Sequence, residues 1–367
     1  MNILLTGATG TLGSQVLFSL LEDKFSRIEK LYLPVREKKS LMPKERIFKM
    51  LESEHVPKFI KNNLQEIRHK IVVVPAKDIL NPECFLGGNR ITHFIHSAGF
   101  VNLSTLPEAK DEIYKENLDF TKSIFKAYTY YIDKFIYIST AFSAGNLSGI
   151  LPNDYLKDNH TAHRNHYEAS KYASEQFLTE AGKEANIPVQ ILRPSVLGGN
   201  IMDHPSFFIS KYMVFYLFAK FFYRSSSKDS VRITAHNDSG LNIIPTDYAA
   251  KVITNVFDTD IEQLNIVHHT TTHIAKGIQK ILDTVDFQNF SLTQNIIDTA
   301  TGFESKLEQF YYNTIGIHLT PYLTSKPCEW DTTLLQQILP IPEYNLEDYL
   351  ANTIQYAKKQ GFKNQQW

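Results

Sequence analysis

A short apolar run, followed at once by three spaced glycines, opens the chain: MNILLTGATGTLG. Glycines at this spacing let a chain turn tightly from a strand into a helix, and they let backbone amides approach a pyrophosphate. The helix predicted next, TLGSQVLFSLLE, adds the partial positive charge of its N-terminus. This order predicts a dinucleotide-binding unit. The residues expected to contact the cofactor here are Gly7, Thr9, Gly10, Thr11, Leu12 and Gly13.

Apolar runs of strand length recur along the first two hundred residues, with helical segments between them. Continuous runs rich in β-branched residues are typical of parallel strands covered on both faces. Their alternation with helices predicts an α/β fold built on a doubly wound parallel Rossmann sheet. The longest connection, 36–69, is predicted to form one or two amphipathic surface helices. The runs lie at 2–6, 31–35, 70–76, 92–98, 134–140 and 188–194.

The alternation loosens after about residue 200. We expect residues 1–200 to form the nucleotide-binding Rossmann domain. Residues 201–367 are expected to form a smaller, mostly helical substrate-binding lobe, with strands in 241–269 returning to the sheet. The aromatic stretch 207–224 is interrupted by lysines and is too short in its apolar part to span a bilayer. It is suited to wall an acyl tunnel, to touch a membrane surface, or to pack as a helix in the core of the lobe.

Composition argues against several classes of function. The net charge of −1 gives no electrostatic attraction to nucleic acid or anionic membranes. Cys84 and Cys328 are far apart and fit no disulfide framework, which suits a reducing compartment. No residues precede the first strand to act as a signal peptide, so a cytoplasmic location is expected. The histidines of VHHTTTH fall at a strand end and a turn, and no metal site is predicted.

The end of the second strand, LPVREKKS, distinguishes between the two nicotinamide cofactors. A protein that prefers NAD tends to carry an acid there, bonded to the ribose 2′-hydroxyl. This chain has Arg36 instead, with Lys38 and Lys39 nearby. A guanidinium can bind a 2′-phosphate, so NADP(H) is the predicted cofactor. Asp78 and Ile79 follow the third strand, where the carboxylate either accepts from the adenine amino group or caps a helix.

The segment HYEASKYASEQF places Tyr167 and Lys171 four residues apart at the start of a helix, on one face. A phenol exchanges protons poorly at neutral pH unless its anion is stabilised, and an ammonium group beside it lowers its pKa. The same ammonium group can bond the nicotinamide ribose. The strand before it, FIYISTAFSAGN, brings Ser139 and Thr140 to the carboxyl edge of the sheet, where ligands of such folds bind.

Six motifs in order resemble the extended short-chain dehydrogenase/reductases: TGATGTLG, HSAG, NLDFT, YISTA, YEASK and LRPSVLGG. The resemblance covers about the first 200 residues. It implies that Tyr167 is the proton donor, that Lys171 activates it, and that Thr140 bonds the substrate oxygen. It also implies an architectural role for Asn117. The further cofactor contacts that it implies are Ser97, Ala98 and Gly99 after the fourth strand, and Pro194, Ser195 and Val196 at the nicotinamide end.

Within that superfamily, THFIHSAGFVNLS, the basic strand tip with the insert KERIFKMLES, and LNIIPTDYAAKVI are similar to the thioester reductases and fatty acyl-CoA reductases. Two positions depart from that pattern. Gly99 stands where thioester reductases commonly repeat alanine, and VPAKDI lacks the glycine that usually precedes the aspartate. The last hundred residues match no pattern that can be carried over residue by residue.

The likeness implies NADPH-dependent reduction of an acyl thioester to an aldehyde or an alcohol. The chain carries no adenylation or carrier domain, so the acyl group is expected on coenzyme A or on a separate acyl-carrier protein. Peripheral membrane contact and a homodimer paired through Rossmann helices are compatible with this. Two alternatives remain open: other chemistry on the same scaffold, such as sugar-nucleotide epimerisation, dehydration or ketone reduction, and a non-catalytic NADP(H) sensor. The intact Tyr167 and Lys171 argue against the sensor.

Overall fold

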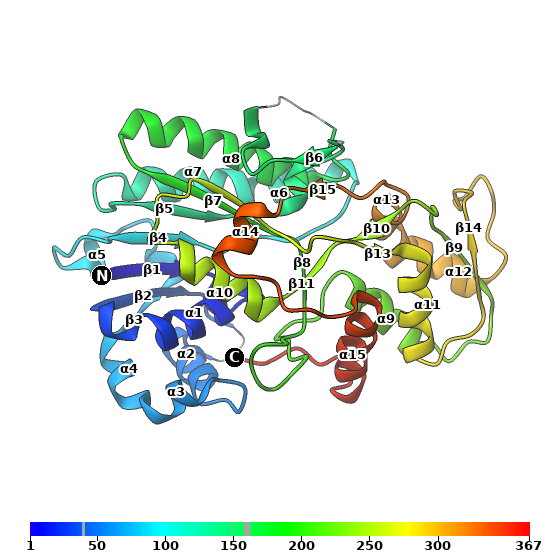
Figure 1. Ribbon diagram of the computed structural model, residues 1–367, viewed down its shortest axis with the longest axis horizontal. Coiled ribbons are helices and arrows are strands. Elements are labelled where there is room, and N and C mark those ends of the chain that lie inside the picture. The colour runs from blue at the N-terminus through cyan, green and yellow to red at the C-terminus, as the bar shows by residue number, and fades with distance from the viewer. Residues whose placement is uncertain (39–40, 148, 158–161) are drawn as a thin grey trace.

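Seven parallel strands form the central sheet, in the order β12-β7-β5-β4-β1-β2-β3 (Figure 1). The structure is a computed structural model that describes residues 1–38, 41–147, 149–157 and 162–367. All six strands predicted from the apolar runs are present, and β12 adds the seventh. The strands are β1 (Asn2–Thr6), β2 (Lys30–Val35), β3 (Ile71–Pro75), β4 (His93–His96), β5 (Phe135–Ile138), β7 (Val189–Pro194) and β12 (Gln263–Ile266).

Helices cover both faces of this sheet (Figure 1). On one face α1 (Thr11–Asp23) packs against α10 (Thr246–Val256), and on the other α7 (Phe120–Tyr128) packs against α8 (His166–Ala185). Apart from the edge strand β3, where Val72 and Val73 are only half-buried, the strands are buried almost throughout, as their continuous apolar sequences predict. The chain order reverses between β1 and β4, so the carboxyl ends of these two strands flank the crevice where ligands of doubly wound folds bind.

The long connection after β2 forms three helices rather than the one or two expected: α2 (Pro43–Leu51), α3 (Lys58–Asn62) and α4 (Leu64–Lys70). Pro57 separates α2 from α3, because proline lacks the amide hydrogen that a continuing helix needs. Asn63 then lies between α3 and α4 with non-helical backbone angles. Two short helices, α5 (Glu83–Leu86) and α6 (Lys110–Tyr114), complete this half of the chain.

The second half builds a lobe with its own apolar core beside the carboxyl edge of the sheet (Figure 1). Most of it is helical, as expected, but β9 (Val231–Thr234) and β14 (Phe290–Thr293) form a parallel pair that the sequence did not predict. The helices are α9 (Phe215–Arg224), α11 (Ile274–Thr284), α12 (Lys306–Tyr311), α13 (Ile317–Leu323), α14 (Thr333–Ile338) and α15 (Leu346–Lys359).

Three small strand pairs lie between the central sheet and the lobe or at their edges. β8 (Val196–Gly198) follows β7 almost directly and pairs in parallel with β11 (Ile243–Pro245), so the sheet leads into the lobe. β10 (Gly240–Leu241) pairs with β13 (Thr272–His273), and β6 (Ile150–Leu151) with β15 (Glu329–Trp330). Within residues 241–269, β12 joins the central sheet and α10 packs against α1. Within the described ranges, every helix is too short or too polar to cross a bilayer.

Candidate active site

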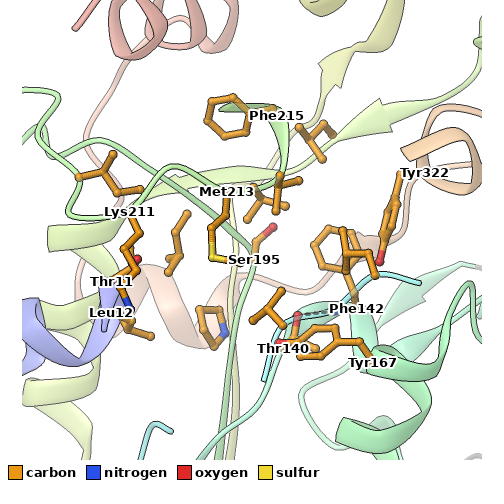
Figure 2. Close-up of a pocket in the computed structure, with 18 of the residues that line it drawn as sticks. Thr11, Leu12, Thr140, Phe142, Tyr167, Ser195, Lys211, Met213, Phe215 and Tyr322 are labelled. Atoms are coloured by element: carbon orange, nitrogen blue, oxygen red, sulfur yellow. Dashed lines mark hydrogen bonds between the residues drawn. The ribbon is translucent and has the colours of Figure 1, made fainter. Parts of the chain in front are cut away.

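One cavity of about 320 Å³ runs along the carboxyl edge of the sheet and continues into the lobe. Figure 2 shows Thr11 and Leu12 on one side of it, Thr140 and Tyr167 on another, and Ser195 and Met213 between them. The lining comes from the loop after β1, the ends of β4, β5 and β7, the start of α8, and the lobe helices α9 and α11. Segments far apart in sequence therefore share one space.

The turn after β1 needs its glycines for two different reasons. Gly7 has a φ of +72°, and a Cβ there would lie 2.9 Å from the backbone nitrogen of Ala98. At Gly13, a Cβ would lie 2.2 Å from the Gly7 carbonyl oxygen. Helix α1 begins with Gly10 as its N-cap and no side-chain cap, so its first amides stay available to an anion in the cavity. The residues fit a dinucleotide phosphate.

The loop after β4 lines the cavity with Ser97 and Gly99. The amide of Ala98 donates to Thr6 Oγ1 at 3.0 Å, which holds this loop against the end of β1. Asn117 acts as the expected architectural residue: its Oδ1 accepts from the Phe100 amide at 2.8 Å, and its Nδ2 donates to Ser170 Oγ at 3.0 Å. The buried side chain thus ties the cofactor loop to α8.

Thr140, Tyr167 and Lys171 all line the cavity. Thr140 lies two residues after the end of β5 with extended backbone, and its Oγ1 accepts from the Phe142 amide at 3.3 Å. Within the described chain its hydroxyl hydrogen has no acceptor, so it can serve a substrate oxygen. Ser139 Oγ, in contrast, donates to Glu175, which is itself paired with Arg193 Nη2 at 2.8 Å. This difference supports the choice of Thr140 over its neighbour.

Helix α8 presents Tyr167 and Lys171 on one face, next to the end of β5. Its start is capped by Asn165, whose side chain accepts from the Glu168 amide. Burial raises the pKa of Tyr167, and the Glu168 carboxylate raises it further, so the phenol holds its proton at neutral pH. The phenol therefore carries its proton in this structure, and its pKa is raised rather than lowered by the lysine as the sequence suggested.

The ammonium group of Lys171 explains that difference. It donates to the Ile138 carbonyl at 2.7 Å and lies 4.1 Å from the centre of the Tyr137 ring. Burial lowers the pKa of Lys171 to about 7, although the nearby Glu175 carboxylate opposes the shift. Lys171 is therefore a weaker source of positive charge than an exposed lysine.

The end of β7 supplies the nicotinamide-side residues predicted from the motifs. Pro194, Ser195 and Val196 line the cavity, and Ser195 Oγ donates to the Asn242 carbonyl at 2.7 Å. The lining that matches the predicted set consists of Gly7, Gly10, Thr11, Leu12, Gly13, Ser97, Gly99, Thr140, Tyr167, Lys171, Pro194, Ser195 and Val196.

Five predicted residues lie outside this lining: Thr9, Arg36, Asp78, Ile79 and Ala98. Ile79 is buried, and its carbonyl accepts from the Tyr128 hydroxyl at 2.8 Å. Asp78 lies in a 3₁₀ turn (Ala76–Asp78), and the next helix begins at Glu83 with Pro82 as its N-cap. The helix-cap interpretation of Asp78 is therefore wrong, and its carboxylate stays a candidate for the adenine. Lys39 lies outside the described residues.

Arg46 on α2 is a residue that the sequence reasoning did not single out. Its guanidinium donates to the Arg36 carbonyl at 2.6 Å, to Thr9 Oγ1 at 3.0 Å and to the Trp367 carbonyl at 2.9 Å. It is 5% exposed, its Nε has no partner, and no Asp or Glu side chain in the described ranges pairs with it. Burial and the charge of Arg36 lower its pKa. A buried guanidinium at the tip of β2 that has an unpartnered Nε and no acidic side chain beside it is suited to a phosphate.

The lobe supplies the rest of the lining, which the sequence motifs did not reach. Apart from Lys211, Thr272 and Tyr322, these side chains are apolar or glycine. The sequence signals for them are the aromatic stretch 207–224, a candidate tunnel wall, and the apolar face of α11, a feature that core helices share. These residues include Ile209, Met213, Val214, Phe215, Phe218, Leu241, Ile274, Gly277, Ile278, Ile281, Leu319, Leu323 and Leu350.

Comparison with known families and proteins adds independent findings. The model of an NAD-binding family described as "Male sterility protein" matches residues 5–253. The chain is similar to the Drosophila melanogaster protein named "Putative fatty acyl-CoA reductase CG8303", at 26% identity over 247 residues. That match covers 56% of this chain and 42% of the relative, so the chain spans less than half of that protein.

Solved structures show the same fold. The terminal R domain of the myxalamid PKS-NRPS pathway has a TM-score of 0.70 at 19% identity, covering 99% of this chain and 91% of that one. UDP-glucuronic acid 4-epimerase from Bacillus cereus, in complex with UDP-glucuronic acid and NAD, has a TM-score of 0.64 at 17% identity, with coverages of 98% and 100%. The dTDP-glucose 4,6-dehydratase DesIV from Streptomyces venezuelae also has 0.64, at 14% identity, covering 98% and 97%. These likenesses confirm the predicted Rossmann fold.

Proposed function

The chain belongs to the male sterility protein family of NAD-binding domains, and on that premise we propose that it reduces acyl thioesters with NADPH. Membership agrees with the resemblance to the extended short-chain dehydrogenase/reductases and with the expectation of an NAD(P)-dependent enzyme of that type. The thioester substrate and the preference for NADPH over NADH go beyond membership, and each draws on this chain's own residues.

The apolar arm of the cavity is the observation that carries the substrate proposal. Beyond Thr140 and Tyr167 the walls come from α9 and α11, with Phe218, Ile278 and Ile281 among them. A sugar nucleotide would bring hydroxyl and phosphate groups into this arm, where they would lose hydrogen bonds to water without replacing them. A hydrocarbon chain gains from the same walls by burying apolar area. The apolar lining therefore supports an acyl group rather than a sugar as the occupant of this arm.

Arg46 supports the preference for NADPH. Its buried guanidinium has an unpartnered Nε and joins the Gly7–Gly13 turn, through Thr9, to the tip of β2, through Arg36. In doubly wound folds the adenosine ribose binds between these two segments. The doubly charged 2′-phosphate of NADPH would supply the counter-charge that a 2′-hydroxyl lacks.

Thr140 and Tyr167 perform the polar part of the reaction. NADPH, when bound, would supply the hydride that the thioester carbonyl accepts. The Thr140 hydroxyl and the Tyr167 phenol donate to the oxygen on which negative charge develops, and the phenol then transfers its proton there. Since burial keeps Tyr167 protonated, the proton is in place before reaction. Lys171 orients the ribose and helps to carry the charge left on the phenolate.

The hemithioacetal that results releases the thiol when its C–S bond breaks and the aldehyde carbonyl reforms. The proton returns from the substrate hydroxyl to the Tyr167 phenolate, and the thiolate leaves with coenzyme A or the carrier arm. A second round of hydride and proton transfer on the aldehyde gives the alcohol. The acyl group arrives already activated, on coenzyme A or on an acyl-carrier protein.

The test is to mix the protein with NADPH and acyl-CoAs of increasing chain length, while following nucleotide oxidation and thiol release together. We expect one free thiol per aldehyde formed, and two nucleotides oxidised per thiol if the alcohol is the product. Oxidation without thiol release, or oxidation that starts only when a ketone is supplied, would overturn the thioester assignment. NADH in place of NADPH, at matched concentrations, measures the cofactor preference in the same assay.

A further inference from the structure

The segment between β8 and α9 brings a lysine from the lobe to the cofactor side of the cavity. Lys211 lines the cavity together with Thr11 and Leu12, which form the first turn of α1. Figure 2 shows its side chain extending toward those two residues, on the opposite side of the cavity from Thr140 and Tyr167. The lysine is thus separate from the catalytic groups and faces the phosphate-binding turn.

The charge of Lys211 has no counterpart in the described parts of the chain. The Lys211 side chain is half-buried, and no hydrogen bond or carboxylate partner is found for its ammonium group there. Burial lowers the pKa of Lys211, and the charges of Lys38, Arg46 and Arg36 lower it further. Holding four cations in one region costs free energy, and an anion bound among them would recover it.

The backbone on both sides of Lys211 is fixed by the C-terminal segment. The Tyr212 amide donates to Asn364 Oδ1 at 2.9 Å, and the Gln365 amide donates to the Ser210 carbonyl at 2.9 Å. The same segment ends beside Arg46, which donates to the Trp367 carbonyl. Residues 364–367 therefore hold the lysine and the arginine in a set relation, which reduces the side-chain and backbone ordering that ligand binding would otherwise require.

We infer that Lys211 binds the diphosphate of the nucleotide from the lobe side, opposite the backbone amides of α1. Lys211 lies beside Thr11 and Leu12, and this position favours contact with the diphosphate. The 2′-phosphate would instead bind near Arg36 and Arg46, at the tip of β2. The nucleotide would then be held by both halves of the molecule. This inference rests on the nucleotide-binding part of the proposed function and is independent of the thioester substrate.

The experiment is a binding titration of the Lys211→Met variant with NADPH and with NADH, without substrate. Because both nucleotides carry the diphosphate, we expect both dissociation constants to rise by the same factor, about tenfold for the loss of one charge-assisted contact. The salt dependence of binding should become shallower. Inorganic pyrophosphate should compete with NADH on the wild-type protein and less well on the variant.

Lys220→Met is the matched control, since Lys220 lies on α9 and donates to the Phe362 carbonyl away from the cavity. Its dissociation constants should equal those of the wild type. Lys211→Arg keeps the charge and should retain most of the affinity, which separates a charge effect from a folding defect. Unchanged binding in Lys211→Met, or weakening of NADPH alone, would overturn the diphosphate assignment. Failure of thioester turnover would leave these titrations unaffected.

Discussion

The two ends of the cavity recognise their ligands by different physics. At the cofactor end, the Gly7–Gly13 turn, the first turn of α1 and Lys211 offer donors and positive charge, and Arg46 adds a cation just outside the lining, bonded to Thr9. At the lobe end, α9 and α11 offer apolar walls. Hydrogen bonds and charge discriminate sharply between ligands, whereas apolar walls discriminate mainly by size. We therefore expect the protein to discriminate strongly between cofactors, and its activity to vary gradually with the length of the substrate. Thr140 and Tyr167 lie where the two ends of the cavity meet.

Removing the phenol at this meeting point should have the largest effect. Tyr167→Phe keeps the ring but has no proton to give, so we expect kcat to fall about 10²- to 10⁴-fold. The dissociation constant of NADPH should change by less than about twofold, because the cofactor end is intact. Single-turnover rates and nucleotide titration measure the two quantities. Retention of most of the activity would remove Tyr167 from its proposed role.

The next largest effect should come from the cation at the tip of β2. Arg46→Met should weaken NADPH about 10- to 100-fold, since a hydrogen bond to a charged group contributes about 1.5–3 kcal/mol. NADH should bind as before. The matched control is Lys49→Met, an exposed lysine on the same helix. Equal weakening of both nucleotides would show that Arg46 acts on the fold rather than on the 2′-phosphate.

A bulky side chain on α11 should change substrate choice by about tenfold. Ile278 is buried and lines the apolar arm, so Ile278→Trp shortens the space available to an acyl chain. We expect kcat/KM for palmitoyl-CoA to fall and that for butyryl-CoA to stay within about twofold. Gln279→Trp, on the exposed face of α11, is the control. Parallel losses on both substrates would argue that the arm does not hold the chain.

The smallest effect concerns pH. Burial lowers the pKa of Lys171 to about 7, so the ammonium form is present below that pH and is lost as pH rises through it. We expect kcat/KM, which reports the free enzyme, to fall about fivefold between pH 7 and pH 8. Lys171→Arg stays charged and should move this falling limb upward, whatever its absolute activity. A flat wild-type profile up to pH 9 would contradict the assignment.

The sequence predicted the Rossmann half well because its signals are local. The glycine turn, the β-branched runs and the Tyr167–Lys171 spacing each depend on residues within a few positions, and the sheet then brings their ends together. The sequence did not identify Arg46, Lys211 and Tyr322 as site residues, because their positions depend on tertiary contacts. Arg46, for example, reaches Thr9, Arg36 and Trp367, which belong to three separate segments.

The missed parallel pair β9 and β14 has a similar cause. Its partners are some sixty residues apart, and Ser291 and Leu292 are exposed, so their run lacks the buried apolar pattern of the central strands. The sequence could not predict the lowered pKa of Lys171 either. The shift arises from burial beside Tyr137 and Gly99 rather than from the spacing between Lys171 and Tyr167. A sequence motif does not show which side chains will surround a charged group in the folded protein, and therefore does not predict its pKa.

The buried guanidinium of Arg46 also affects the resistance of the protein to unfolding and proteolysis. A ligand that binds only the folded form stabilises it by RT ln(1 + [L]/Kd), about 2.7 kcal/mol at a hundredfold excess over Kd. Because the nucleotide would neutralise Arg46 and Lys211 as well as fill the cavity, the loaded protein should open less often and offer fewer cleavage sites to proteases. The supply of reduced nucleotide would thereby set the amount of the protein as well as its rate.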